Sequence, residues 1–115
     1  MAEKRNENVV LCGANSYEEK YYFNPAFSNL PEQVKKELQA MTVLYTENAG
    51  GILTVEFTPE GTLTLSTGAS EYDYYYDEIE AGLQIRKVSE EHAELFQMLE
   101  LYYRVFVLGE GNDRK

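Results

Sequence analysis

A hairpin pattern in the middle of the chain constrains its fold most strongly. Residues 52–58 alternate between apolar and polar side chains, which is typical of a strand with one buried face. Residues 59–61 are Pro-Glu-Gly, which favours a turn because proline presets φ and glycine accepts positive φ. Residues 62–67 then repeat the alternation, so the pattern predicts an antiparallel hairpin. Its inward positions are Leu53, Val55, Phe57, Leu63 and Leu65.

A third strand is predicted directly after this hairpin. Residues 68–70, Gly-Ala-Ser, suit a second turn, and residues 71–77 are rich in tyrosine, which favours sheets. Burying unpaired aspartates is costly, so the side carrying Tyr72, Tyr74 and Tyr76 is expected to face the core. Tyr75 then lies outside, between Asp73 and Asp77. Because sequential strands with short links pair as neighbours, we expect a meander.

Two helices are expected at residues 31–47 and 89–107. The first begins near Pro31 with Ser28 or Asn29 as its cap, and Gly50-Gly51 ends it. Ser89 is the expected cap of the second, and Gly109 ends it. The apolar face of the first helix is Val34, Leu38, Met41 and Tyr45, widened by Leu44. That of the second is Leu95, Leu99, Tyr102 and Phe106, broadened by Phe96 and Tyr103.

The N-terminal third leaves two interpretations open. Residues 9–14 indicate a short buried strand, and Ser16 with Glu19 matches the spacing of a capping box, which predicts a short helix ended by Asn24-Pro25. The alternative is a strand at residues 20–23, where aromatic residues are concentrated. The short helix is the interpretation that we prefer at this point.

These elements together predict an α+β fold of two layers. The expected sheet is an antiparallel meander of three to four strands, with residues 9–14 as the possible fourth strand and the two main helices packed on one face. At 115 residues the chain is expected to form a single domain, 1–115, with residues 1–8 and 110–115 frayed.

Composition and charge exclude several classes of function. The net charge of −10 opposes nucleic-acid binding, which depends on Lys and Arg neutralising phosphates, and it disfavours anionic membranes. No apolar run is long enough to span a membrane. The N-terminal residues lead into no signal-peptide hydrophobic region, and Cys12 is the only cysteine, so we expect a cytoplasmic protein.

The excess negative charge is concentrated in one region. Between Lys36 and Arg86 the chain has no Lys, Arg or His but carries nine carboxylates. The densest part is residues 71–78, in which acids alternate with tyrosines. Such a surface favours a basic protein partner. The candidate partner-binding residues are Glu71, Asp73, Tyr75, Asp77 and Glu78.

No residue pattern indicates catalysis, a metal or a cofactor. Cys12 lies in an apolar strand, where an inert buried thiol is usual, and His92 is expected to be solvated in the first turn of the last helix. One His and one Cys leave zinc without its usual ligands, and no spacing matches an EF-hand. The acid-tyrosine segment therefore has two main interpretations, a solvated face that keeps the sheet soluble or a binding face anchored by Tyr75.

Three functional hypotheses follow. The first is a non-enzymatic interaction module that presents an acidic, tyrosine-containing sheet face to a basic protein partner. The second is a small hydrolase that uses paired carboxylates. The third is a structural homodimer with no ligand, formed through the tyrosine-rich strand or the last helix.

Several segments carry a resemblance to a known family. They are residues 12–24 (CGANSYEEKYYFN), 44–47 (LYTE), 50–53 (GGIL), 77–79 (DEI) and 99–103 (LELYY). Together they resemble an uncharacterised domain-of-unknown-function family of small acidic cytosolic proteins from anaerobic Gram-positive bacteria. The resemblance spans nearly the whole chain and implies a bacterial origin. It implies no known activity, so no catalytic residue can be carried over.

Overall fold

The computed structural model describes residues 7–110 of the chain. The predictions for residues 1–6 and 111–115 lie outside this described part. The elements in chain order are β1 (Val9–Asn15), β2 (Lys20–Phe23), the 3-10 helix η1 (Pro25–Phe27), α1 (Glu32–Ala49), β3 (Ile52–Phe57), β4 (Leu63–Gly68), α2 (Glu78–Glu91), α3 (Ala93–Tyr102) and the π-helix η2 (Tyr103–Val107).

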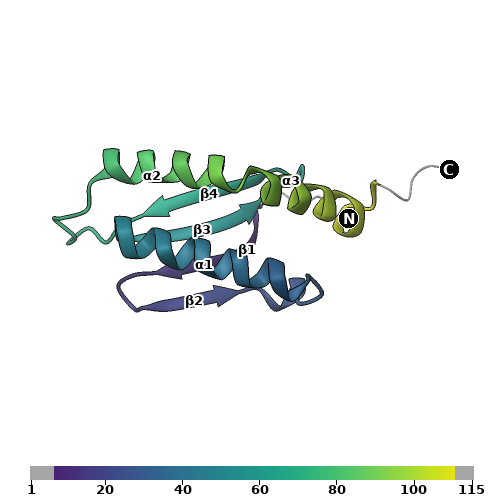
Figure 1. Ribbon diagram of the computed structural model, residues 1–115, viewed down its shortest axis with the longest axis horizontal. Coiled ribbons are helices and arrows are strands. Elements are labelled where there is room, and N and C mark those ends of the chain that lie inside the picture. The colour runs from purple at the N-terminus through teal and green to yellow at the C-terminus, as the bar shows by residue number, and fades with distance from the viewer. Residues whose placement is uncertain (1–6, 111–115) are drawn as a thin grey trace.

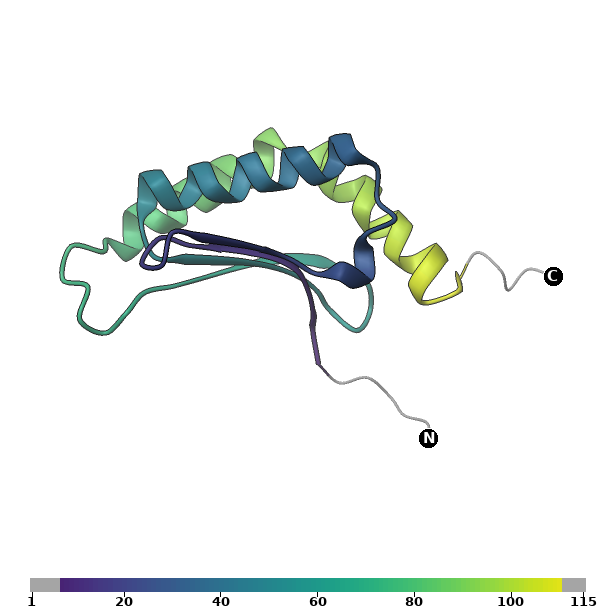
Figure 2. The ribbon, with the colours of Figure 1, turned by 90° about the horizontal axis from the view of Figure 1, so that it is seen from below.

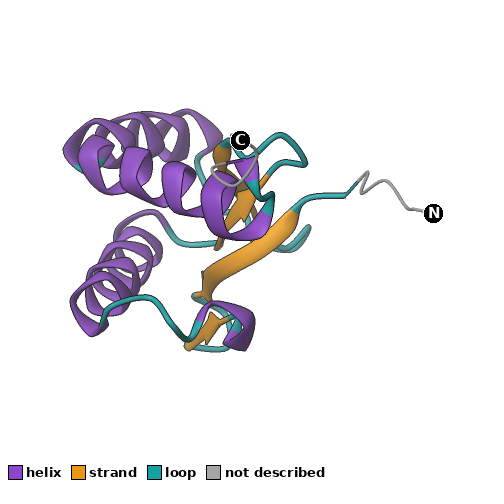
Figure 3. Ribbon diagram, turned by 90° about the vertical axis from the view of Figure 1, so that its right-hand side faces the viewer, coloured by secondary structure: helices purple, strands orange, loops and turns teal. Residues whose placement is uncertain are grey.

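The four strands form one antiparallel sheet in the order β2-β1-β3-β4. Two hairpins, β1–β2 and β3–β4, are joined through the pairing of β1 with β3 (Figure 1). The three α-helices lie in a second layer on one face of the sheet (Figures 2 and 3). The predicted α+β class and its two layers are confirmed. The expected meander is wrong. Residues 9–15 form a central strand of the sheet, and residues 71–77 form no strand.

The predicted short helix after Ser16 is wrong, and the alternative strand at residues 20–23 is correct. The Asn15 side chain accepts the backbone N–H groups of Tyr17 and Glu18 at 2.9 and 3.2 Å, so it stabilises a tight turn instead of a helix cap. The aromatic strand then pairs with β1, where Tyr21 lies opposite Ala14. Asn24 caps η1 by accepting the N–H of Ala26.

The helix predicted at residues 31–47 is confirmed as α1. Pro31 occupies its N-cap position without a side-chain cap, so neither Ser28 nor Asn29 acts as predicted. Gly50 and Gly51 end the helix at φ values of 78° and 73°, which glycine adopts without strain. The predicted inward face is buried except for Val34, which is half-buried, and Leu44 is 57% exposed, so it does not widen that face.

The C-terminal helical region begins earlier than predicted. Asp77 caps α2 by accepting the N–H groups of Ile79 and Glu80 at 3.0 and 3.1 Å, and Ser89 lies inside that helix. The chain bends at His92, which ends α2 and precedes α3. The apolar stripe is only partly correct, since Leu95 and Leu99 are buried whereas Phe106 is 73% exposed. Tyr103, which was predicted to broaden the stripe, is buried in the core.

The core lies between the sheet and the helices. The inward residues of β3, Leu53, Val55 and Phe57, are completely inaccessible to solvent, as the hairpin pattern predicted. The Phe57 ring stacks on Tyr103 with ring centroids 4.2 Å apart, and Phe27 of η1 lies 5.6 Å from Phe57. This aromatic cluster joins the centre of the sheet to the C-terminal helical segment.

The opposite face of the sheet is not covered by any described helix (Figures 2 and 3). The strand registers place Gly13 of β1 on this face, between Tyr22 of β2 and Thr54 of β3. A Cβ atom at Gly13 would lie 2.9 Å from the backbone oxygen of Leu53, so a side chain cannot be added without moving the backbone. Glycine is therefore required at this position by close packing of neighbouring strands.

This close approach predicts the effect of replacing Gly13. Gly13→Ala is expected to lower the free energy of unfolding by roughly 1–3 kcal/mol, because an added methyl group forces the strands apart. Denaturant unfolding measures the change. The control is Gly82→Ala in α2, where a Cβ would meet no atom within 4 Å and alanine is expected to stabilise the helix by about 0.5–1 kcal/mol. Equal stabilities for the two variants would contradict the packing argument.

A second prediction concerns Cys12, whose side chain is completely buried in β1. Burial raises the pKa of its thiol from 9.0 to about 12, and only the thiolate reacts rapidly with alkylating reagents. At pH 8 the native protein should therefore be alkylated roughly a thousandfold more slowly than the urea-unfolded protein. Mass spectrometry of timed samples measures both rates. Rapid labelling of the native protein would show that β1 is exposed in solution.

Candidate functional site

The acid-tyrosine segment forms a loop at one end of the sheet. Residues 69–77, here called the acid–tyrosine loop, connect β4 to α2 and contain no strand, so the predicted third strand is wrong. Asp73 accepts the N–H of Tyr75 at 3.2 Å, and Asp77 caps α2. These local hydrogen bonds favour turns over the strand that the tyrosines alone indicate.

The predicted burial of its tyrosines is also wrong for two of the three. Tyr72 and Tyr74 are 72% and 85% exposed, and only Tyr76 is half-buried. The Tyr76 ring packs against the backbone of Gly51, where an added Cβ would lie 2.8 Å from a ring carbon. Tyr75 is 96% exposed, as expected. The loop therefore projects three tyrosine rings into solvent and attaches itself through the fourth.

A tyrosine from the β1–β2 turn fixes the backbone of this loop. The hydroxyl of Tyr17 donates to the Asp73 carboxylate at 2.6 Å and accepts the N–H of Ser70 at 3.0 Å. The hydrogen bond to Asp73 raises the pKa of Tyr17, because ionisation would remove the proton that the hydroxyl donates to this carboxylate. Sequence reasoning missed this contact, because no local pattern links two residues that are 56 positions apart.

The five predicted site residues are brought together, but they do different things. Glu71, Tyr75 and Glu78 are exposed, and none of them accepts or donates a side-chain hydrogen bond within residues 7–110. Asp73 and Asp77 are used to shape the loop and to cap α2. Of the four predicted acids, only Glu71 and Glu78 have carboxylates without a hydrogen bond in the described residues. Asp73 and Asp77 instead fix the backbone that carries them.

A polar hollow of about 580 Å³ lies beside the acid–tyrosine loop. Its acidic lining residues are Glu71, Asp73 and Glu78, Thr67 and Gly68 line it at the end of β4, and none of its described lining residues is basic. In the described part of the chain, no three His, Cys, Asp or Glu side chains are grouped closely enough to hold a metal ion. Carboxylates in this arrangement suit the guanidinium or ammonium group of a partner.

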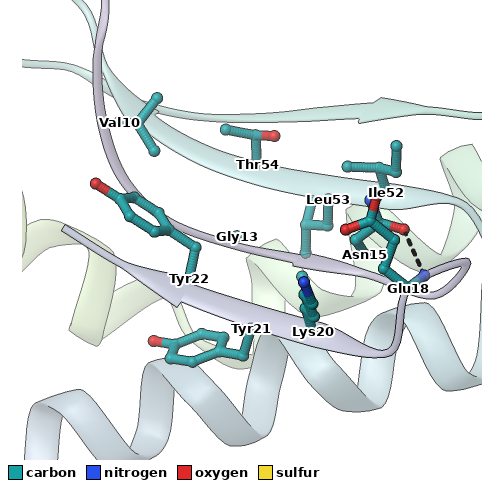
Figure 4. Close-up of a pocket in the computed structure, with 11 residues that line it drawn as sticks. Val10, Gly13, Asn15, Glu18, Lys20, Tyr21, Tyr22, Ile52, Leu53 and Thr54 are labelled. Atoms are coloured by element: carbon teal, nitrogen blue, oxygen red, sulfur yellow. Dashed lines mark hydrogen bonds between the residues drawn. The ribbon is translucent and has the colours of Figure 1, made fainter.

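The uncovered face of the sheet carries a second hollow, of about 600 Å³ (Figure 4). Gly13 forms its floor, Val10 and Tyr22 stand at one end, and Glu18 and Lys20 stand at the other. A glycine within a strand can signal such a close backbone approach, and Gly13 lies inside the strand predicted at residues 9–14. The hollow is shallow and has an apolar centre with one charged end.

His92 is not a solvated histidine. It lies at the break between α2 and α3, and its Nδ1 atom is 3.0 Å from a carboxylate oxygen of Glu37 in α1. The side chain is 23% exposed, so the contact holds the helix layer together at the surface. Cys12 is completely buried, as predicted.

Comparison with known families identifies the chain. The model of a family of unknown function, DUF6145, matches residues 8–111. The chain belongs to this family. No curated protein and no solved structure shows significant similarity to it. In residues 7–110, none of the helices combines the length and the apolar content that crossing a membrane requires.

The contact of Tyr17 with the loop leads to a testable expectation for this DUF6145 protein. Tyr17→Phe removes the hydroxyl that joins Ser70 and Asp73, so backbone amides in residues 70–77 should exchange with deuterium several-fold faster. Tyr22→Phe is the matched control, since this tyrosine has similar exposure and its hydroxyl makes no hydrogen bond within the described residues. Unchanged exchange in Tyr17→Phe would show that Tyr76 and Asp77 hold the loop without Tyr17.

Proposed function

We propose that this protein is a non-enzymatic interaction module that binds a basic partner protein through the acid–tyrosine loop. One observation supports this proposal more than any other. Tyr72, Tyr74 and Tyr75 are highly exposed on a loop whose backbone is held by Tyr17, Asp73 and Asp77. A solvated loop has no need of three projecting aromatic rings.

Exposed tyrosines on a fixed backbone are suited to protein recognition. Tyrosine supplies a large amphipathic contact area and is enriched among residues that contribute most to binding free energy. A loop that is already held in place loses less conformational entropy on binding. The surface continues onto α2, where Ile79 and Leu83 are 78% and 55% exposed and lie four residues apart on one side of the helix.

The charge of this surface favours a basic partner. Glu71 and Glu78 flank the exposed rings, and no described basic residue forms an ion pair with either. Residues 37–85 contain no Lys, Arg or His, so the segment that forms this surface supplies no positive charge of its own. Such a field increases the association rate of cationic partners and repels anionic ones.

The proposal is tested by capturing proteins from a native lysate on the immobilised protein at low and high salt. Two loop variants are compared with the wild type, Tyr75→Ala and the double variant Glu71→Gln/Glu78→Gln. These residues are chosen because they make no internal side-chain hydrogen bond, whereas changes at Asp73 or Asp77 would alter the loop itself. We expect capture of a basic protein that falls by about tenfold in each variant and is weakened by salt.

The matched control is Glu90→Gln/Glu94→Gln, which removes the same charge from exposed positions near the break between α2 and α3. This variant should capture the partner as well as the wild type does. The proposal is wrong if no salt-sensitive partner is captured, or if the loop variants and the control variant behave alike.

A further inference from the structure

The outer edge of β4 presents backbone hydrogen-bonding groups that are not used within the sheet. The Thr58 N–H donates to the carbonyl of Thr62 at 2.8 Å, so these two residues form a hydrogen-bonded pair. Hydrogen-bonded and non-hydrogen-bonded pairs alternate along an antiparallel ladder, and the register therefore makes the even-numbered residues of β4 the ones that bond to β3. The odd-numbered residues therefore direct their N–H and C=O groups away from β3. The N–H of Leu63 is taken by the Glu100 carboxylate of α3 at 2.8 Å. The groups of Leu65 and Thr67 have no such partner within residues 7–110.

The two edges of this sheet differ in their protection against further pairing. β2 is four residues long, begins with Lys20 and is followed directly by Asn24-Pro25. Short length, lysine and proline are the usual means by which edge strands avoid pairing with other chains. β4 is six residues long and contains neither a charged residue nor a proline. Within residues 7–110, Leu63 is the only β4 residue whose outward N–H is bonded by a side chain of another element.

The edge is also accessible from the side. The helices occupy a separate layer above the sheet, and α2 runs beside β4 in that layer (Figures 1 and 2). The second half of β4, residues 66–68, is exposed to solvent. The second half of the edge, which includes Thr67, is therefore open to solvent, whereas Leu65 is half-buried.

The charge at the end of this edge indicates which kind of segment fits. Thr67 and Gly68 line the same hollow as the acidic side chains of Glu71, Asp73 and Glu78. A strand that pairs with Thr67 would bring its neighbouring side chains to these carboxylates. A basic segment gains charge-assisted hydrogen bonds there, whereas a second copy of this chain would add a further acidic loop to a molecule of net charge −10.

We propose that the partner binds as an extended basic segment that adds a fifth strand to the β4 edge, with lysine or arginine side chains in the acidic hollow. This inference rests on the proposed function and specifies how the partner is recognised. Main-chain hydrogen bonds to Leu65 and Thr67 provide the pairing, and the acids provide the selectivity for a basic sequence. The exposed tyrosines then cover the bound segment at its end.

The test uses a defined probe, a synthetic peptide of about eight alternating lysine and valine residues. Thr67→Pro removes an outward N–H and leaves the ladder to β3 intact, which is the one arrangement in which proline is tolerated in an edge strand. Thr67→Ala keeps that N–H and is the matched control. We expect the peptide to bind wild type and Thr67→Ala equally, and Thr67→Pro about tenfold more weakly.

A second measurement does not depend on the stability of the proline variant. A peptide of the same sequence with alternate backbone nitrogens methylated keeps its charge but cannot donate the pairing hydrogen bonds, so it should bind wild type about tenfold more weakly. The amides of Leu65 and Thr67 should also become protected from hydrogen exchange when the unmodified peptide binds. Unchanged exchange of these amides overturns the inference.

The outcomes separate this inference from the proposed function. If Glu71→Gln/Glu78→Gln weakens binding while methylation and Thr67→Pro do not, strand addition is overturned and the loop remains the binding surface. If the unmodified peptide does not bind but lysate capture persists, strand addition is likewise overturned. If the peptide does not bind and no basic protein is captured from the lysate, both proposals fail. If light scattering shows a wild-type dimer that Thr67→Pro disperses, the edge is occupied by a second copy and the inference is wrong.

Discussion

The pairing of β1 with β3 is the constraint on which the rest of this structure depends. It joins two hairpins that are separated in sequence by α1, and its register places Asn15 opposite Ile52, which in turn lies opposite Gly68. One end of β1, β3 and β4 is therefore aligned at the same end of the sheet. The turn after β1 and the loop after β4 leave the sheet side by side, which is why the hydroxyl of Tyr17 reaches Ser70 and Asp73.

This alignment turns a charged segment into a defined surface. The same acids and tyrosines in a free loop would sample many conformations, and binding would then require that they be ordered. Here Tyr17 and the half-buried Tyr76 hold the loop from two sides, and Asp77 joins it to the first turn of α2. The polar groups that shape the loop differ from those that face solvent, so changes at Glu71, Tyr75 and Glu78 can test recognition separately from folding.

The distribution of the helices gives the molecule three kinds of surface. One face of the sheet is covered by helices and the other is open around Gly13 (Figure 2), while residues 66–68 on the β4 edge are exposed to solvent. The acid–tyrosine loop lies at the end of that edge, so the proposed main-chain pairing and the proposed charge selection involve neighbouring groups. We propose on this basis that the partner of this protein is a basic segment in an extended conformation.

The sequence by itself determined the elements that depend on local periodicity. The alternation around Leu53 and the helical spacing around Leu38 required one buried face each, and Gly50-Gly51 required a helix end, so the fold class, α1 and the β3–β4 hairpin could be predicted. The sequence also located the charged segment that forms the candidate site. Only the tertiary structure decided that this segment is a loop, that β1 is central and that Tyr17 supports Asp73. Such features depend on contacts between residues far apart in the chain, and the free energy of a distant hydrogen bond leaves no local pattern from which it can be inferred.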